Sequence, residues 1–145
     1  LLLVSVIGIS SYFLFKDKIN LLDVDHSAVD WNGKKQKDTS GEENTIAIPG
    51  FEKVTLYANE TTQAVNFHNP EINDCYFKIS LIHPDGSVLW ISDLIEPGKG
   101  MYSIELEKTL AVGEYENAVL KYECFSLNDQ SPLNGSEINL KLVVV

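Results

Sequence analysis

Cys75 and Cys124 are the residues of this chain with the most evident chemistry, because two cysteines can form a disulfide or supply a thiol. An even number of cysteines outside the cytoplasm is typical of a disulfide. A bridge would close a loop of about fifty residues and stabilise the fold by roughly 3–4 kcal/mol in the chain-entropy treatment. The alternative is a pair of buried free thiols, since cysteine packs well as a small hydrophobic residue.

Acid–base and metal chemistry have weaker support. The candidate carboxylate pairs lie in a polar segment or on the polar face of an expected strand: Asp23 with Asp25, Glu42 with Glu43, and Glu105 with Glu107. The three histidines, His26, His68 and His83, have no serine or cysteine neighbour in a catalytic frame, and no zinc spacing is present. Phosphate-binding loops, nucleophile elbows and metalloprotease motifs are also missing from the sequence. We therefore expect no enzyme, no catalytic or metal-binding residue and no cofactor.

Aromatic side chains are the remaining candidates for a binding site. A row of exposed aromatic rings on a sheet can bind glycans or protein partners, and the candidates are Trp31, Tyr57, Tyr76, Trp90 and Phe125. The alternative is that such rings belong to the core or to cross-strand pairs. Trp31 lies in a polar segment, where it could dock that segment on the domain, enter a membrane interface or contact a partner.

The first fifteen residues, Leu1–Phe15, are almost wholly apolar and end at Lys16. A membrane-spanning helix needs roughly 20 apolar residues, and because the chain begins without methionine we expect a longer natural segment. Residues 1–18 are predicted to form an N-terminal apolar helix that anchors the protein in the membrane. The alternatives are a cleaved secretory signal and a helix packed in a soluble protein or fibre.

The rest of the chain is acidic and organised as one domain. The formal net charge of -10 argues against nucleic-acid binding. Residues 19–44 are predicted to be a polar tether and residues 45–145 a single folded domain. The expected location is the cell membrane, with one membrane pass and the domain on the extracytoplasmic side.

From Thr45 onward, apolar residues alternate with period two, which is typical of strands. Strands are expected over Thr45–Ile48, Lys53–Ala58, Gln63–His68, Cys75–Ile82, Ser87–Ser92, Met101–Leu106, Glu114–Ser126 and a last strand with inward Ile138, Leu140, Leu142 and Val144. Turn residues separate them at His83–Gly86 and Glu96–Gly100. About eight strands and no amphipathic helix predict an all-β, immunoglobulin-like antiparallel β-sandwich.

This strand order bears on the two cysteines. If the strands that begin at Cys75, Ser87, Met101 and Glu114 alternate in direction, the first strand begins at the end where the fourth finishes. Cys75 opens the first strand, and Cys124 lies near the end of the fourth. Both fall on the apolar face of their strand, so they can approach each other within the core.

Several short blocks resemble a known group of proteins: Asn69-Pro70 with Asn73-Asp74-Cys75-Tyr76-Phe77-Lys78, Pro84-Asp85-Gly86, Ile95-Glu96-Pro97-Gly98 and Leu110-Ala111-Val112-Gly113-Glu114-Tyr115. The chain resembles small membrane-anchored surface proteins of Gram-positive, clostridia-like bacteria with an immunoglobulin-like or cell-adhesion-type β-sandwich. The resemblance implies an extracytoplasmic, non-enzymatic role, and no catalytic residues carry over from it.

These observations predict a cell-surface binding or structural protein. Its domain would bind a protein of the cell envelope or a second copy of itself, and Leu1–Phe15 would hold it in the membrane. Three alternatives remain: a glycan-binding module, a protease-inhibitor-like sandwich acting through the polar loop Asn128–Gly135, and a fibre or pilus-like subunit packed through its N-terminal helix.

Overall fold

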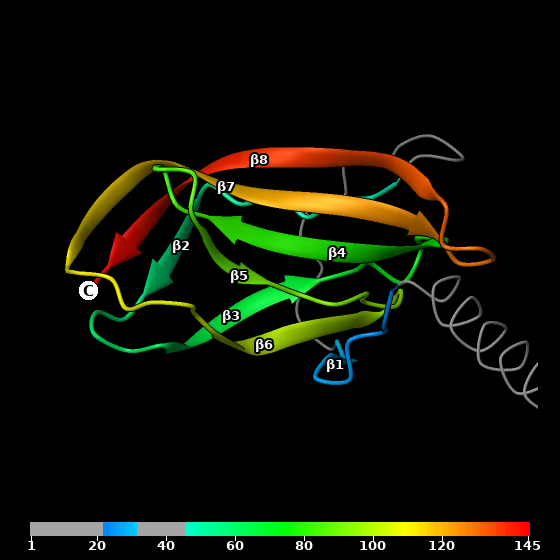
Figure 1. The fold of residues 1–145 in the computed structure, drawn as a ribbon, viewed down its shortest axis with the longest axis horizontal. Helices are drawn as coiled ribbons and strands as arrows, with labels where there is room; N and C mark the ends of the chain where they lie inside the picture. The colour runs from blue at the N-terminus through cyan, green and yellow to red at the C-terminus, as the bar shows by residue number, and fades with distance from the viewer. Residues whose placement is uncertain (1–21, 32–45) are drawn as a thin grey trace, which may run out of the picture.

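The computed structural model describes residues 22–31 and 46–145 and contains eight strands (Figure 1). The strands are β1 (Val29–Asp30), β2 (Lys53–Leu56), β3 (Thr62–His68), β4 (Cys75–Ile82), β5 (Val88–Ile91), β6 (Lys99–Glu105), β7 (Gly113–Ser126) and β8 (Pro132–Val144). No helix occurs in these two ranges, so the predicted all-β class is confirmed for them. The predicted N-terminal anchor lies outside the described residues, as do residues 19–21 and 32–44 of the predicted tether and Thr45.

The strands form two sheets, which appear as two layers in Figure 1. One sheet has three strands in the order β1-β6-β3, and the other has five in the order β2-β8-β7-β4-β5. This arrangement is compatible with a β-sandwich. The longest ladder joins β7 and β8, and β4 pairs with β7 without a register shift from Cys75 opposite Ser126 to Ile82 opposite Val119. We refer to residues 46–145, which carry strands β2 to β8, as the two-sheet domain.

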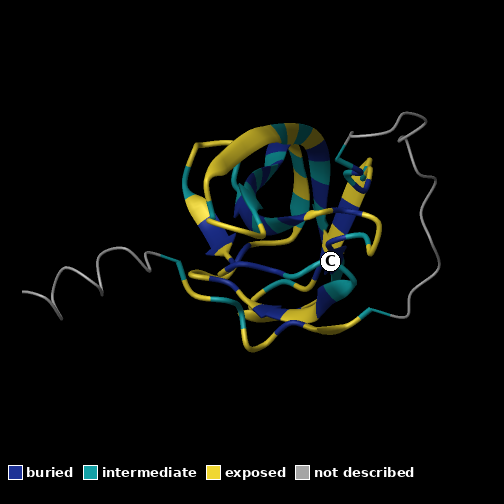
Figure 2. Ribbon diagram, turned by 90° about the vertical axis from the view of Figure 1, so that its right-hand side faces the viewer, coloured by how far each residue is buried: buried dark blue, intermediate teal, exposed yellow. Residues whose placement is uncertain are grey.

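One hydrophobic core lies between the sheets. The five-stranded sheet contributes fully buried Phe77, Ile79 and Leu120, and the three-stranded sheet contributes Phe67 and Ile104. Figure 2 shows buried and exposed positions alternating along the strands, as the period-two pattern predicts. Burying one such side chain contributes about 1.5–3 kcal/mol, so this core is the main source of stability.

The strand directions differ from the prediction in one place. β2 runs parallel to β8, with Lys53 opposite Lys141 and Leu56 opposite Val144, so the expectation of a wholly antiparallel sandwich is wrong. No hairpin connects these strands, because β2 comes early in the chain and β8 is the last strand. The direction of β2 is therefore free of the constraint that a short turn would impose.

Two predicted segments differ locally. Residues 46–48 do not form a strand, so the described part of the predicted strand Thr45–Ile48 is corrected. The predicted polar loop Asn128–Gly135 is also shorter, because β8 already begins at Pro132. Gly135 belongs to that strand: a Cβ atom there would overlap the carbonyl oxygen of Tyr122 across the β7–β8 ladder.

Residues 46–48 are held instead by two buried asparagines. The side chain of Asn73 accepts the amide of Ala47 at 2.8 Å and donates to the Ala47 carbonyl at 2.9 Å. The same Nδ2 group donates to Oδ1 of Asn69, whose own Nδ2 donates to the carbonyls of Cys75 and Ile95. Buried polar groups require such partners, so this asparagine pair fixes the segment without a strand.

The N-terminal described segment, residues 22–31, falls within the predicted tether but lies against the two-sheet domain. Its strand β1 pairs antiparallel with β6, Val29 opposite Gly100 and Asp30 opposite Lys99. Strand β1 has two residues, and the segment around it has no period-two apolar pattern. Sequence patterning therefore gave no signal for a strand here.

Replacing Asn73 with alanine should lower the free energy of unfolding by about 2–4 kcal/mol, because it leaves the buried Ala47 amide and Asn69 Oδ1 without partners. The exposed Asn139 provides the matched control, and its change to alanine should cost less than about 0.5 kcal/mol. Urea denaturation followed by tryptophan fluorescence measures both. Equal stability of the two variants would contradict a structural role for the asparagine pair.

Candidate binding surfaces

The two cysteines lie close together inside the core. Cys124 is opposite Phe77 and Cys75 is opposite Ser126, so the cysteines are diagonal neighbours on the inner face of β4 and β7. The structure shows no bond between their sulfur atoms; both residues are 1% exposed and share a hydrogen bond. This bond and burial raise the pKa of the Cys124 thiol, which makes it a poor nucleophile. The disulfide between them stays a prediction.

The carboxylates and histidines serve local structure. His83 accepts the amide of Asp85 through Nδ1, and Ser87 donates to Asp85 through its amide and hydroxyl, which lowers the pKa of Asp85 to about 2. Glu105 accepts hydrogen bonds from the hydroxyls of Thr61 and Thr62 across the β3–β6 pair. These are exposed contacts within a turn and between neighbouring strands. Within the described ranges, no three His, Cys, Asp or Glu side chains are grouped to hold a metal ion.

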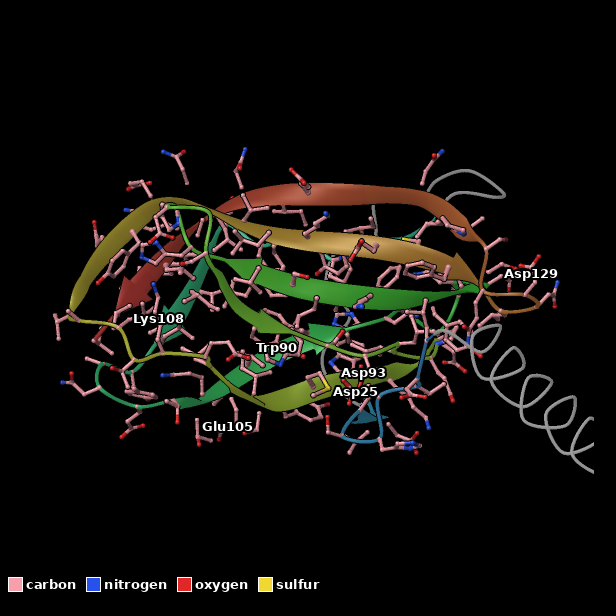
Figure 3. The ribbon with its side chains drawn as sticks, in the orientation of Figure 1. Asp25, Trp90, Asp93, Glu105, Lys108 and Asp129 are labelled. Carbon is pink, nitrogen blue, oxygen red and sulfur yellow. The ribbon has the colours of Figure 1, made fainter. Side chains whose placement is uncertain are left out.

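The five candidate aromatic residues do not form one platform. Trp90 is 7% exposed and packs against Phe67 with 5.7 Å between ring centroids, so it belongs to the core (Figure 3). Tyr57 is 56% exposed but follows β2, whose last residue pairs with Val144 at the far end of β8. Only Tyr76 and Phe125 are brought together, as directly opposite residues of β4 and β7.

An open hollow of about 470 Å³ adjoins Phe125 at the end where β7 meets β8. Pro132 lies opposite Phe125, and Leu133, which is 44% exposed, also lines the hollow. Charged residues alternate nearby, with Lys121 opposite Glu137 on the neighbouring strand. The surface therefore combines apolar contact area with groups that donate and accept hydrogen bonds.

One edge of β8 carries main-chain groups without a strand partner among the described residues. β2 pairs only with the final part of β8, from Lys141 to Val144. The Lys141 amide donates to the Glu52 carbonyl on this side. Alternate residues of a strand present their main-chain groups to the same side, so the amides and carbonyls of Asn139 and Glu137 face this edge as well.

Trp31 docks the N-terminal segment on the domain, which was one of its three predicted alternatives. Its indole stacks on the imidazole of His68, with 3.7 Å between ring centroids and an interplanar angle of 6°. The indole N–H donates to Oδ1 of Asn66 at 2.6 Å. Gly100 leaves room for the ring, because a Cβ atom there would lie 3.1 Å from Cδ1 of Trp31 and 2.7 Å from the Phe67 carbonyl oxygen.

His68, Asn66 and Gly100 were not identified from the sequence as contacts of Trp31. His68 is 3% exposed, and its Nδ1 atom has no hydrogen-bond partner among the described residues. Burial lowers the pKa of His68 to about 4. The only sequence signal was the position of His68 at the end of the predicted strand Gln63–His68, directly before Asn69-Pro70.

Comparisons with protein families, curated proteins and solved structures find no match to this chain. The resemblance to clostridia-like surface proteins therefore stays an expectation. Among the residues described, none belongs to a helix with the length and apolar character needed to cross a membrane.

The neutral state of His68 predicts a pH-dependent stability. In the unfolded chain His68 takes up a proton near its ordinary pKa of 6.5, but in the folded protein it does so only near pH 4. Its contribution is therefore complete above pH 6.5 and is lost between pH 6.5 and pH 4. The free energy of unfolding should fall by up to roughly 3 kcal/mol over this window. Attraction between the Trp31 indole face and the protonated imidazole makes the fall smaller.

His68→Phe keeps a ring on Trp31 and removes the titration. Between pH 7 and pH 4, the free energy of unfolding should therefore fall more in the native protein than in the variant. Denaturation curves at each pH measure this difference. Parallel pH profiles for the two proteins would show that His68 is protonated equally well in the folded and unfolded states.

Proposed function

We propose that this protein is a non-enzymatic binding module of the cell envelope, with an immunoglobulin-like β-sandwich that adds a strand of a protein partner to the open edge of β8. The observation that carries the proposal is the outward-facing main chain of Glu137 and Asn139, which no described strand pairs. Such an edge is a ready template for an extended segment. Main-chain hydrogen bonds then supply affinity, and side-chain pockets supply specificity.

The neighbouring surface fits this mode of binding. The hollow lined by Leu133, Gly135 and Glu137 lies at the start of the same strand, so a side chain of an added strand has a place to pack. Most of this part of β8 is exposed, with Leu133 and Asn139 among the exposed residues. Lysine is one of the residues that commonly block unwanted strand pairing at an edge. The sequence between Pro132 and Leu140 contains no lysine.

The partner is proposed to lie close to the membrane. The Leu22 carbonyl accepts a hydrogen bond from Gln130 at 3.3 Å, so the chain is already attached to the domain at residue 22. If Leu1–Phe15 is the anchor, residues 16–21 form the remaining connection. Even fully extended, this connection spans only about 25 Å. We therefore expect a partner at the membrane surface rather than one reached by a long tether.

A photo-crosslinking side chain at Glu137, in the full-length protein in its native membrane, should give a discrete adduct with an envelope protein. Asn139→Pro should reduce that adduct by about fivefold or more, because proline removes an outward amide and obstructs an added strand. The matched variant Asn139→Ala keeps the amide and should leave the adduct unchanged.

The exposed Ile91 on β5, at the opposite edge of the sheet, is the control position for the crosslinker. An equally strong adduct from Ile91, or a Glu137 adduct that is the same in the proline and alanine variants, would contradict binding at the β8 edge. Circular dichroism of both variants confirms that they remain folded.

A glycan-binding module is the second candidate, favoured by the Tyr76–Phe125 pair beside the hollow. Aromatic faces stack on sugar rings, and the nearby charged groups can bind hydroxyls. On an array of cell-wall glycans, Tyr76→Ala should lower binding about tenfold, whereas Tyr57→Ala should not. Equal loss in both variants, or no glycan bound by the native protein, would eliminate this candidate.

A further inference from the structure

Residues 22–31 contact two parts of the two-sheet domain, and we call the surface between these two parts the acceptor groove. One wall is the 93–95 segment: the Asp25 amide donates to the Leu94 carbonyl at 2.7 Å, and the Leu94 amide donates to the Asp23 carbonyl at 2.9 Å. A carboxylate oxygen of Asp25 also accepts the Asp93 amide at 3.0 Å, and Figure 3 shows these two residues side by side. The segment is thus bound largely through its main chain.

The other wall is the edge of β6. Strand β1 pairs with Lys99 and Gly100, and the Trp31 amide donates to the Gly98 carbonyl at 3.0 Å. Between the two walls, Ala28 is buried among the core residues. The Trp31 ring closes the groove by stacking on His68. Main-chain pairing combined with one buried small side chain and one aromatic anchor is the pattern by which sheet edges bind peptides.

We propose that this groove is a peptide-binding site for the sequence of residues 22–31, filled by the chain's own segment and able to take the same segment from a second copy. The exchanged copy would place its Trp31 on the His68 of its neighbour, so each site would be completed by the other molecule. This inference rests on the contacts of residues 22–31 and does not depend on the proposed β8 edge.

The length of the connection permits the exchange. Residues 32–45 separate the segment from the two-sheet domain, and an extended chain of that length reaches at most about 50 Å. A domain of this size has a radius of gyration of about 13 Å, so a neighbouring groove lies within reach. Exchange rebuilds identical contacts, so its equilibrium depends mainly on how concentrated the copies are.

The first experiment separates the segment from the domain in the full-length protein. A protease site is inserted between Gly33 and Lys34, the protein is immobilised in detergent through an N-terminal tag, and the site is cut. We expect the two-sheet domain to stay on the resin. An excess of synthetic peptide with the sequence of residues 22–31 should then elute it, whereas the peptide with Trp31→Ala should need at least about tenfold more. Loss of the domain directly after cleavage, or equal elution by both peptides, would overturn the proposal.

The second experiment tests exchange in the uncut chain. One full-length copy carries Asp30→Cys and a second, differently tagged copy carries Lys99→Cys, at positions that face each other in the β1–β6 pair. Exchange places the two new thiols together only between different molecules, so mild oxidation of the concentrated mixture should give a disulfide-linked heterodimer. Asp30→Cys mixed with Glu107→Cys is the control. A heterodimer yield no higher than in the control would overturn exchange, whether or not the cut segment stays bound.

Discussion

Asn69 stands where the chain leaves the three-stranded sheet and turns into the five-stranded sheet, and every polar group of this residue is satisfied there. Its amide donates to the Lys99 carbonyl, and its carbonyl accepts the Gly98 amide. Its side chain binds the carbonyls of Cys75 and Ile95 and accepts the side chain of Asn73. A chain that changes sheets leaves main-chain groups without ladder partners, and burial makes such groups costly. The asparagine pair removes that cost at the crossover.

The remaining architecture follows from this crossover. Holding Gly98 and Lys99 beside Asn69 fixes the start of β6, which provides the edge that binds β1. The hydrogen bond from Asn69 to the Ile95 carbonyl fixes residues 93–95, which form the other wall of the groove. Leu94 in this wall pairs with Val24 of the bound segment. The N-terminal segment is therefore bound to elements that the asparagines position. His68, one residue before Asn69, is held where Trp31 stacks on it.

The sequence predicted the long strands well because they obey one strong rule. Alternating apolar residues predicted β4 with its observed bounds and predicted the buried residues Leu140, Leu142 and Val144 of β8. The turn at His83–Gly86 was predictable because Gly86 takes φ 90°, which suits glycine. In contrast, the parallel pairing of β2 depends on a partner nearly ninety residues away, about which local pattern carries no information.

The candidate surfaces were less predictable for the same reason. Trp90 and Phe125 both occur in strands, and only tertiary packing decides that Trp90 enters the core while Phe125 joins Tyr76. Trp31 lies in a charged segment with the composition of a tether, yet one ring contact and a few main-chain bonds attach it. A two-residue strand has no period to detect, so the sequence pattern carried no sign that β1 pairs with β6.

Residues 22–31 are bound to the two-sheet domain through main-chain hydrogen bonds. Amide hydrogen exchange of the full-length protein tests this attachment most directly, because the amides of Asp25 and Trp31 donate to the Leu94 and Gly98 carbonyls. These two amides should exchange at least about a hundredfold more slowly than those of an unstructured chain of the same sequence. Exchange at the unstructured rate, with β4 and β7 still protected, would contradict this attachment.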